Sequence, residues 1–308
     1  MISNKQAICD TLLQLASEDR DILVLCSDSR GSASASGFAE SLPGQFIELG
    51  IAEQNLVSVA AGLASGGMRP FVLAPAAFLS TRSMEQVKVD ICYSGSNVKL
   101  IGISGGVSYG PLGLTHHAVH DIAALGVLPG LRVYMPADAE ASRSLTRRLA
   151  ADSLPAYVRV GRSASPEVYP AGGADLSEDR ALLTRPGNDV TVIACGDMVA
   201  PAAAASDALR EQGVSCRVLD MFCIKPLDCE AVRRAAAETS GIVTVEEHSS
   251  FLGLGSLVAQ ELAGTGVPLT RLGLPDAPVV TGGQHEVLDY YGLNAGGIAR
   301  AAYALCRR

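Results

Sequence analysis

The 308-residue sequence lacks the features that would place it in a membrane or on a nucleic acid. Its most apolar stretch, residues 70–79, is about half as long as a membrane-spanning helix must be. The first residues do not form the pattern of a secretory signal peptide. Lysine and arginine number 24 against 32 acidic residues and do not cluster, whereas nucleic-acid binding needs clustered positive charge. We therefore expect a cytoplasmic protein with no membrane and no nucleic-acid partner.

Several motifs are also missing. None of the eight cysteines belongs to a Cys-x-x-Cys pair, which argues against a zinc site and favours reduced core thiols. There is no P-loop, no Gly-x-Gly-x-x-Gly opening a helix and no Gly-x-Ser-x-Gly elbow. His116, His117 and His120 lie close together, but only Asp121 accompanies them as a further metal ligand. This pattern favours hydrogen bonding or proton transfer over a metal site, so we predict no metal held by this chain.

What the sequence does contain is a regular alternation of apolar strands with helical patterns. In the first half, strands are expected at 21–27, 70–73, 98–104, 132–135 and 156–160, and helices at 51–65, 84–94, 121–128 and 138–151. A second series has strands at 190–195, 215–220 and 242–246, and helices at 201–212, 228–239 and 255–263. Continuously apolar strands separated by helices indicate parallel sheets that are covered on both faces. The predicted fold class is α/β, with two domains that are each a mostly parallel sheet flanked by helices.

The two series are separated by a stretch rich in proline, glycine and acidic residues. We therefore divide the chain into a first domain at 1–165, a linker at 166–187 and a second domain at 188–308.

Candidate site residues gather where ligands of open α/β sheets bind, at the carboxyl ends of the strands. Asp28 follows the first strand, Glu53 begins a helix, and a glycine-rich loop runs from Ser104 to His117. Glu53 has two interpretations that the residues alone leave open. A carboxylate in the first turn of a helix complements the helix dipole, and it can also hydrogen-bond a ligand nitrogen.

A series of motifs resembles the transketolase family. The matching segments are ELGIAEQN at 48–55, Phe78 with Arg82 and MEQV at 84–87, a Thr-His ending at 115–116, PADAE at 136–140, VEEH at 245–248 and GLGS at 253–256. The first is similar to the Gly-Ile-x-Glu-Gln helix of transketolases and deoxyxylulose-phosphate synthases. Each motif is weak alone, but together they cover nearly the whole chain in the family's order.

One part of a full transketolase has no counterpart here. The family's N-terminal domain, whose Gly-Asp-Gly motif holds the diphosphate and a divalent metal, is missing from the sequence. The resemblance therefore implies the C-terminal subunit of a split, two-chain transketolase, with a pyrimidine-binding domain followed by a transketolase C-terminal domain. It implies an N-terminal partner subunit in an α2β2 heterotetramer. It also implies thiamine diphosphate as cofactor, with Mg²⁺ or Ca²⁺ bound mainly by the partner.

The resemblance also implies a transferase that moves a two-carbon ketol unit from a ketose or ketose phosphate donor to an aldehyde acceptor. By this resemblance the catalytic residues are Glu53 and His116. The cofactor would be bound by Asp28, Glu53, Phe78 and Arg82. The substrate would be bound by Ser32, Ser104, Leu112, His116, His117 and Arg162. Glu53 would hydrogen-bond the aminopyrimidine ring and Phe78 would stack on it. Ser32 and Arg162 would lie where the family binds a substrate phosphate. From the residues alone, Phe78 could equally be an ordinary core aromatic and Arg162 a surface side chain.

The sequence departs from the family at the substrate end of the site. Leu112 replaces the acidic residue of the family's Gly-Glu-Asp-Gly, Ser104 stands where a histidine is common, and His117 replaces a glutamine. Leucine accepts no hydrogen bond, and an unpaired buried hydroxyl costs about 1–3 kcal/mol. We hypothesise an atypical acceptor, a less hydroxylated or carrier-bound aldehyde.

Two alternatives remain open at this point. One is the β subunit of a 2-oxoacid dehydrogenase E1, which shares the cofactor and a Gly-Ile-Ala-Glu helix. The other is a non-catalytic paralogue that stabilises a partner. The sequence Glu246-Glu247-His248 is interpreted as mostly structural, at a subunit contact.

Overall fold

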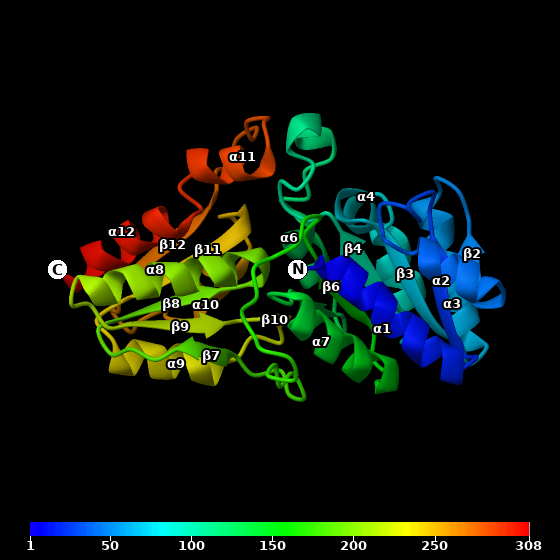
Figure 1. The fold of residues 1–308 in the computed structure, drawn as a ribbon, viewed down its shortest axis with the longest axis horizontal. Coiled ribbons are helices and arrows are strands. Elements are labelled where there is room, and N and C mark those ends of the chain that lie inside the picture. Colours follow the sequence, from blue (N-terminus) through cyan, green and yellow to red (C-terminus); the bar gives the residue numbers. More distant parts are fainter. Residues whose placement is uncertain (308) are drawn as a thin grey trace.

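The first of two sheets lies in the amino-terminal half and carries the predicted site. The computed structural model describes residues 1–307 (Figure 1). This sheet has the strand order β10-β5-β6-β4-β3-β1-β2, with only β10 antiparallel to its neighbour. Its strands are β1 (Ile22–Cys26), β2 (Phe46–Glu48), β3 (Arg69–Pro75), β4 (Lys99–Ile103), β5 (Arg132–Tyr134), β6 (Ala156–Arg159) and β10 (Cys223–Lys225). The central strands β1 and β4 are buried along their length, as their mostly apolar sequences predict.

Helices cover both faces of this sheet, as the alternation of patterns predicts (Figure 1). They are α1 (Asn4–Glu18), α2 (Ser36–Ser41), α3 (Glu53–Ser65), α4 (Ala76–Thr81), α5 (Met84–Gln86), α6 (Asp121–Gly126) and α7 (Ala139–Ala151). Shorter turns are the 3₁₀ helices η1 (Pro43–Gln45) and η3 (Gly110–Thr115) and the π-helical η2 (Val87–Tyr93). The PADAE motif places Asp138 as the N-cap of α7, where its carboxylate accepts from the Ala141 amide at 2.8 Å.

The second sheet has the order β12-β11-β8-β9-β7. Its strands are β7 (Leu182–Arg185), β8 (Val190–Ala194), β9 (Cys216–Asp220), β11 (Ile242–Ser249) and β12 (Leu269–Leu274). Its helices are η4 (Gly196–Met198), α8 (Val199–Glu211), α9 (Cys229–Glu238), α10 (Leu254–Glu261), α11 (Gln284–Tyr290) and α12 (Ala295–Cys306). Four strands are parallel and β7 is antiparallel to β9. The predicted fold class, two mostly parallel sheets flanked by helices, is confirmed.

One strand of the second series, β10, belongs to the first sheet. β10 follows β9 in sequence but pairs with β5 of the first sheet, and β7 lies inside the segment predicted as a linker. Sequence patterns did not reveal β2, β7, β10, β12, α2, α4, α11 or α12. The four strands are edge strands, and β2, β7 and β12 are only partly buried, so they lack the continuous apolar signal of a central strand.

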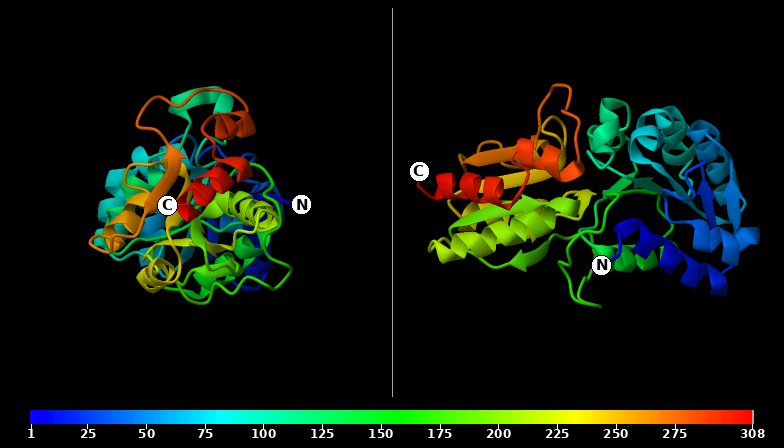
Figure 2. Two further views of the ribbon diagram at one scale, coloured as in Figure 1. Left: turned by 90° about the vertical axis from the view of Figure 1, so that its left-hand side faces the viewer. Right: turned by 45° about the horizontal axis from the view of Figure 1, so that its top comes forward.

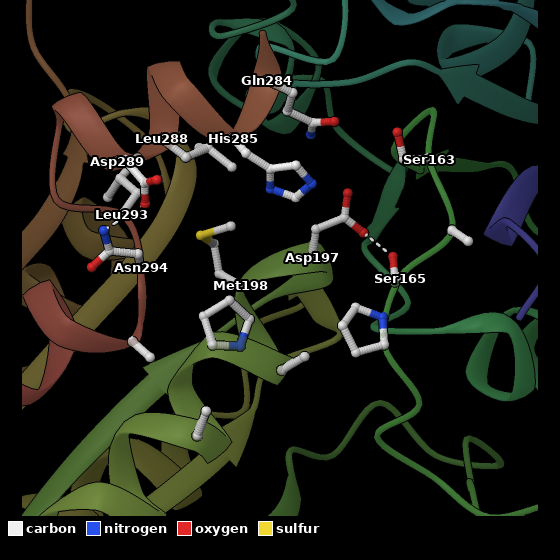
Figure 3. Close-up of a pocket in the computed structure, with 16 residues that line it drawn as sticks. Ser163, Ser165, Asp197, Met198, Gln284, His285, Leu288, Asp289, Leu293 and Asn294 are labelled. Carbon is white, nitrogen blue, oxygen red and sulfur yellow. Dashed lines mark hydrogen bonds between the residues drawn. The ribbon is translucent and has the colours of Figure 1, made fainter.

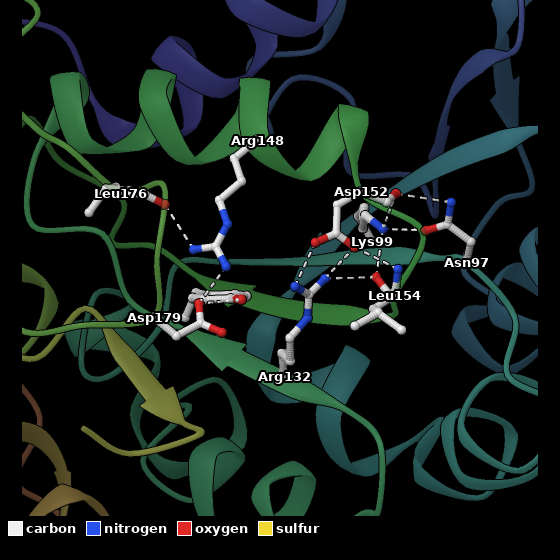
Figure 4. Close-up of polar contacts among 9 residues, drawn as sticks. Asn97, Lys99, Arg132, Arg148, Asp152, Leu154, Leu176 and Asp179 are labelled. Atoms are coloured by element: carbon white, nitrogen blue, oxygen red, sulfur yellow. Dashed lines mark hydrogen bonds and ion pairs between the residues drawn. The ribbon is translucent and has the colours of Figure 1, made fainter. Parts of the chain in front are cut away.

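The segment between the units is also tied down by polar contacts (Figure 4). Arg148 of α7 donates to the Leu176 carbonyl at 2.8 Å and to Asp179 at 2.7 Å. Nearby, Arg132 forms a two-pronged pair with Asp152 at 2.6 and 2.8 Å. Both arginines lie away from the carboxyl ends of the strands, so these contacts hold the scaffold.

Candidate functional site

The strand ends named by the sequence have unusual backbone geometry. Asp28 directly follows the turn after β1 and Ser104 follows β4, and both adopt positive φ values, 54° and 56°. Such values are uncommon for residues other than glycine and cluster at functional sites. The Asp28 amide donates to the Glu48 carboxylate at 2.6 Å, which links the first two candidate segments.

Glu53 is the first residue of α3 and is 2% exposed. Its Oε2 accepts from Arg82 Nη1 at 2.6 Å, whereas its Oε1 receives only a long hydrogen bond of 3.4 Å from the Ser27 hydroxyl. A buried carboxylate normally has all its acceptor sites filled. The helix-dipole and ligand-binding interpretations are therefore compatible, because Oε1 has capacity for another donor.

A continuous series of ring contacts extends from Arg82. Its guanidinium carbon lies 4.4 Å from the Phe78 ring centroid, and the Phe78 ring meets His116 edge-on at 5.2 Å. His116 meets Tyr109 edge-on at 5.7 Å, and Arg162 lies 5.1 Å over the Tyr109 ring. Five residues from three chain segments are thus in contact. Four of them were predicted as site residues; Tyr109 was missed, although it lies inside the glycine-rich loop.

The segment from Gly106 to Ala118 forms a closed loop that we call the substrate loop. Gly106 and Ala118 exchange two backbone hydrogen bonds, of 3.1 and 2.8 Å, which pin its two ends together. The loop carries η3 at its tip, with Leu112 53% exposed. Leu112 is therefore free in this chain to face a substrate or another subunit.

Two other predicted substrate residues lie deeper. Ser104 is 1% exposed and its hydroxyl has no hydrogen-bond partner among residues 1–307. His117 is fully buried, and its Nε2 lies 3.2 Å from the Gly110 carbonyl oxygen. Burial lowers the pKa of His117, so the neutral ring is favoured. In this chain His117 supports the loop from inside, and its substrate-binding role stays a prediction.

Ser32 and Arg162 have a common neighbour that sequence reasoning missed. The Lys5 ammonium donates to the Ser32 carbonyl at 2.7 Å. The pKa of Lys5 is lowered by burial and, next, by the positive charge of Arg162, which indicates that the two cations are close. Two cations beside an exposed serine form a suitable setting for an anion. Lys5 lies about 150 residues from Arg162 in sequence, and no local pattern marks it.

The motif Glu246-Glu247-His248 lies at the carboxyl end of β11, buried between the two units of the chain. Burial raises the pKa of Glu246 and of Glu247 to about 7 and lowers that of His248 to about 4. Glu246 accepts from the amides of Leu254 and Gly255 at 2.7 and 2.8 Å, so it caps the start of α10. The motif holds the contact between the two domains inside this chain.

A cavity of about 370 Å³ lies between the units, next to this motif (Figure 3). Apolar side chains such as Met198 and Leu288 line much of it, and Asp197 and His285 face each other across it. One Asp197 oxygen accepts from the Ser165 hydroxyl at 2.7 Å, and burial raises the pKa of Asp197. None of the predicted site residues lines this cavity.

Neither a metal cluster nor a membrane helix is found in the described part of the chain. Residues 1–307 contain no group of three or more His, Cys, Asp or Glu side chains placed to hold a metal ion. Over the same residues, no helix combines the length and apolarity needed to cross a bilayer.

Comparison with known proteins decides the family. Residues 1–167 match the family model described as the transketolase pyrimidine binding domain, and residues 179–298 match the transketolase C-terminal domain. The chain belongs to the transketolase family. It is 47% identical over its whole length to a subunit of the apulose-4-phosphate transketolase of Phocaeicola vulgatus, of which the match covers 99%. It is 37% identical to the 6-deoxy-6-sulfo-D-fructose transketolase subunit SqwH of a Clostridium species, covering 97% of this chain and 93% of that one.

A solved structure agrees with this assignment. The structure described as "Split gene transketolase, inactive beta4 tetramer" superposes with a TM-score of 0.88 at 36% identity, covering 99% of this chain and 98% of that one. The predicted resemblance to a split transketolase is confirmed, because these relatives are subunits that match from end to end. They favour a transketolase over a 2-oxoacid dehydrogenase subunit. Membership of the family also implies dependence on thiamine diphosphate.

Proposed function

We propose that this chain is the C-terminal subunit of a two-chain transketolase. With an N-terminal partner subunit it transfers a two-carbon ketol unit from a ketose phosphate donor to an aldehyde acceptor. The partner supplies the diphosphate site and the Mg²⁺ or Ca²⁺ ion, and the assembly is an α2β2 heterotetramer. The full-length match to relatives named as subunits supports this division of labour.

The contact series from Glu53 to His116 is the observation that carries the proposal. The Glu53 Oε1 atom has capacity for a hydrogen bond beyond the long one from Ser27, and a carboxyl group there can share a proton with the ring nitrogen of an aminopyrimidine. Phe78 lies beside the Glu53–Arg82 pair and offers a flat apolar surface for that ring. When bound, thiamine diphosphate supplies the carbon nucleophile that carries the two-carbon unit. Asp28 lies at the neighbouring strand end and completes the cofactor side.

His116 connects the cofactor side to the substrate side, because it contacts both Phe78 and Tyr109. Its ring is only partly buried, so it can donate a hydrogen bond to a substrate oxygen and exchange a proton with it. Arg162 and Lys5, with Ser32 beside them, form the phosphate end. His117 supports the substrate loop from inside, and Ser104 lies buried just before the loop begins.

The substrate class follows from Leu112 and from the relatives. An apolar side chain at this position favours an acceptor with fewer hydroxyl groups than an ordinary aldose phosphate. The relative at 47% identity is named for apulose 4-phosphate. We propose this sugar phosphate as the first donor to test.

Reconstitution tests the proposal. The purified chain is mixed with its N-terminal partner, thiamine diphosphate and Mg²⁺, and ketol transfer is measured with apulose 4-phosphate and a panel of aldehydes. We expect transfer only when both chains and the cofactor are present. A complex that binds cofactor but transfers no ketol unit would support a stabilising paralogue instead, provided that Glu53→Ala leaves its assembly and cofactor binding unchanged. Oxidative decarboxylation of a 2-oxoacid onto a lipoyl group would indicate the E1 alternative.

A further inference from the structure

The substrate loop belongs to the first domain, but the second domain contacts it at its base and at its tip. In Figures 1 and 2 the orange segment leading into α11 lies beside the teal segment that contains η3. These contacts involve Glu247 and residues 281–284, to which the proposed function gives no role; the sequence motif gave Glu247 only a structural one. The inference drawn from them rests on the proposed function, because it concerns the same site.

Both ends of the loop are hydrogen-bonded to the end of β11. The Val107 amide donates to Glu247 Oε1 at 2.8 Å on the outgoing side. On the returning side, the Ser249 amide donates to the Val119 carbonyl at 2.8 Å. Glu247 and Ser249 are two residues apart on one rigid strand, so β11 sets the position of both ends of the loop together.

The tip of the loop fits against the chain just before α11. The Gly282 amide donates to the Gly110 carbonyl at 3.4 Å, and a Cβ atom on Gly110 would lie 2.1 Å from the Gly282 carbonyl oxygen. A separation of that size is a severe overlap with backbone, so only glycine fits at this position. The side-chain Nε2 of Gln284 donates to Glu247 Oε1 at 3.2 Å and to the Ser108 hydroxyl at 3.5 Å. Gln284 therefore joins the contact at the base to the contact at the tip.

Burying the Glu247 carboxyl group costs desolvation free energy, and polar neighbours offset that cost. Arg159 is also buried, and its guanidinium donates to the Glu247 backbone carbonyl at 2.6 Å and lies 3.4 Å from Asp121. The side-chain carboxylate of Glu247 is directed instead to the loop amide of Val107. This bond restrains the loop whether Glu247 is ionised or neutral, because both forms offer an acceptor oxygen to the Val107 amide.

We propose that Glu247 and residues 281–284 are positioning elements that fix the substrate loop and thereby the placement of His116 and Leu112 against the acceptor. The C-terminal domain then contributes to acceptor selectivity without touching the substrate. Cofactor binding depends on Glu53 and Phe78, which these elements do not contact. A change in these elements should therefore alter acceptor selectivity and leave cofactor affinity unchanged.

Gly110→Ala is the first test, in the reconstituted two-chain enzyme. The added methyl group must push the tip away from Gly282, whereas Gly126→Ala at the end of α6 meets nothing within 4 Å and is the matched control. Because small misplacements of reacting groups cost up to about 100-fold in rate, we expect Gly110→Ala to lower kcat/KM by about tenfold or more. The ratio of kcat/KM between two aldehyde acceptors should change, and the dissociation constant for thiamine diphosphate should stay at the wild-type value.

Hydrogen exchange provides a second test that needs no activity. In the same complex, Glu247→Ala should speed exchange of the Val107 and Ala118 amides by about tenfold or more. Glu247→Gln keeps an acceptor oxygen and should restore most of the protection. If Gly110→Ala and Glu247→Ala match Gly126→Ala in acceptor ratio and in exchange, the positioning role is overturned. If the wild-type complex transfers no ketol unit, the proposed function fails, while the exchange result still decides whether the second domain restrains the loop.

Discussion

The carboxylate of Glu53 and the guanidinium of Arg82 form an ion pair of 2.6 Å in which the glutamate is buried and the arginine is 43% exposed. Because only the glutamate is buried, the main effect of the pair is to orient the Glu53 carboxylate. Arg82 fixes one oxygen of Glu53 and leaves the other oriented by a single weak hydrogen bond from Ser27. The same arginine lies over Phe78, so one side chain orients both the predicted polar contact and the predicted aromatic contact to the cofactor.

Glu53→Gln tests the polar contact directly. The amide keeps the shape of the side chain, but it loses the charge that pairs with Arg82 and the carboxyl proton that can be shared with the ring nitrogen. We expect kcat of the reconstituted enzyme to fall by about 100-fold or more, in the range that loss of a proton-transfer group produces. Glu18→Gln, an exposed glutamate of α1, is the control and should leave kcat unchanged. Retention of activity within about twofold of wild type would contradict the assigned role.

Leu112→Asp tests the acceptor hypothesis. The new carboxylate can accept a hydrogen bond from a sugar hydroxyl, a contact that contributes about 1–3 kcal/mol. We expect kcat/KM for ribose 5-phosphate, relative to a short aldehyde such as glycolaldehyde, to rise by about tenfold or more. Leu114→Asp places the same charge on the same exposed turn and should leave this ratio unchanged. Equal effects of the two variants would mean that Leu112 does not face the acceptor.

Arg162→Ala and Lys5→Ala test the phosphate end. Each removes a charge-assisted contact, so KM for a phosphorylated donor should rise by about tenfold or more. KM for an unphosphorylated analogue should not change, which makes each variant its own control. Arg20→Ala, an exposed arginine after α1, should affect neither substrate. A parallel rise in KM for both substrates would indicate a general disturbance of the site.

Asp220 makes stability depend on pH. It is fully buried in β9, and burial raises its pKa to about 7, although the Tyr169 hydroxyl donates to it at 2.7 Å. Between pH 3.8, the ordinary pKa of an aspartate, and about pH 7, Asp220 therefore keeps its proton in the folded state and loses it in the unfolded state. The corresponding stability is fully present below pH 3.8 and is lost as pH rises through about 7.

Asp220→Asn should remove this loss, because the amide cannot ionise. We expect its free energy of unfolding, relative to wild type, to increase from pH 4 to pH 7 by at most about 1.4 kcal/mol per pH unit. Urea unfolding at several pH values measures the difference, with exposed Asp276→Asn as the control. A difference that is constant across this pH range would show that Asp220 is ionised in the folded protein.

Much of the fold could be predicted because its signals are local. The central strands β1, β4 and β8 are mostly apolar, and helices α3 and α7 begin at recognisable acidic residues. The strands that escaped prediction, β2, β7, β10 and β12, owe their structure to a neighbour across the sheet. Pairing of β10 with β5 joins segments about 90 residues apart, and no window of sequence contains that information.

The sequence by itself determined the fold class, the family and the identity of Glu53, Phe78 and His116 as candidates, because each depends on residue type and order along the chain. The tertiary structure alone decided how they meet. It placed Phe78 against His116, brought Lys5 to Arg162 and bonded Val107 to Glu247 across 140 positions. It also gave the second domain, in which sequence motifs indicated little chemistry, a contact with the substrate loop. These are contacts between distant segments, fixed by burial and hydrogen bonding in the folded chain, and local sequence patterns do not contain them.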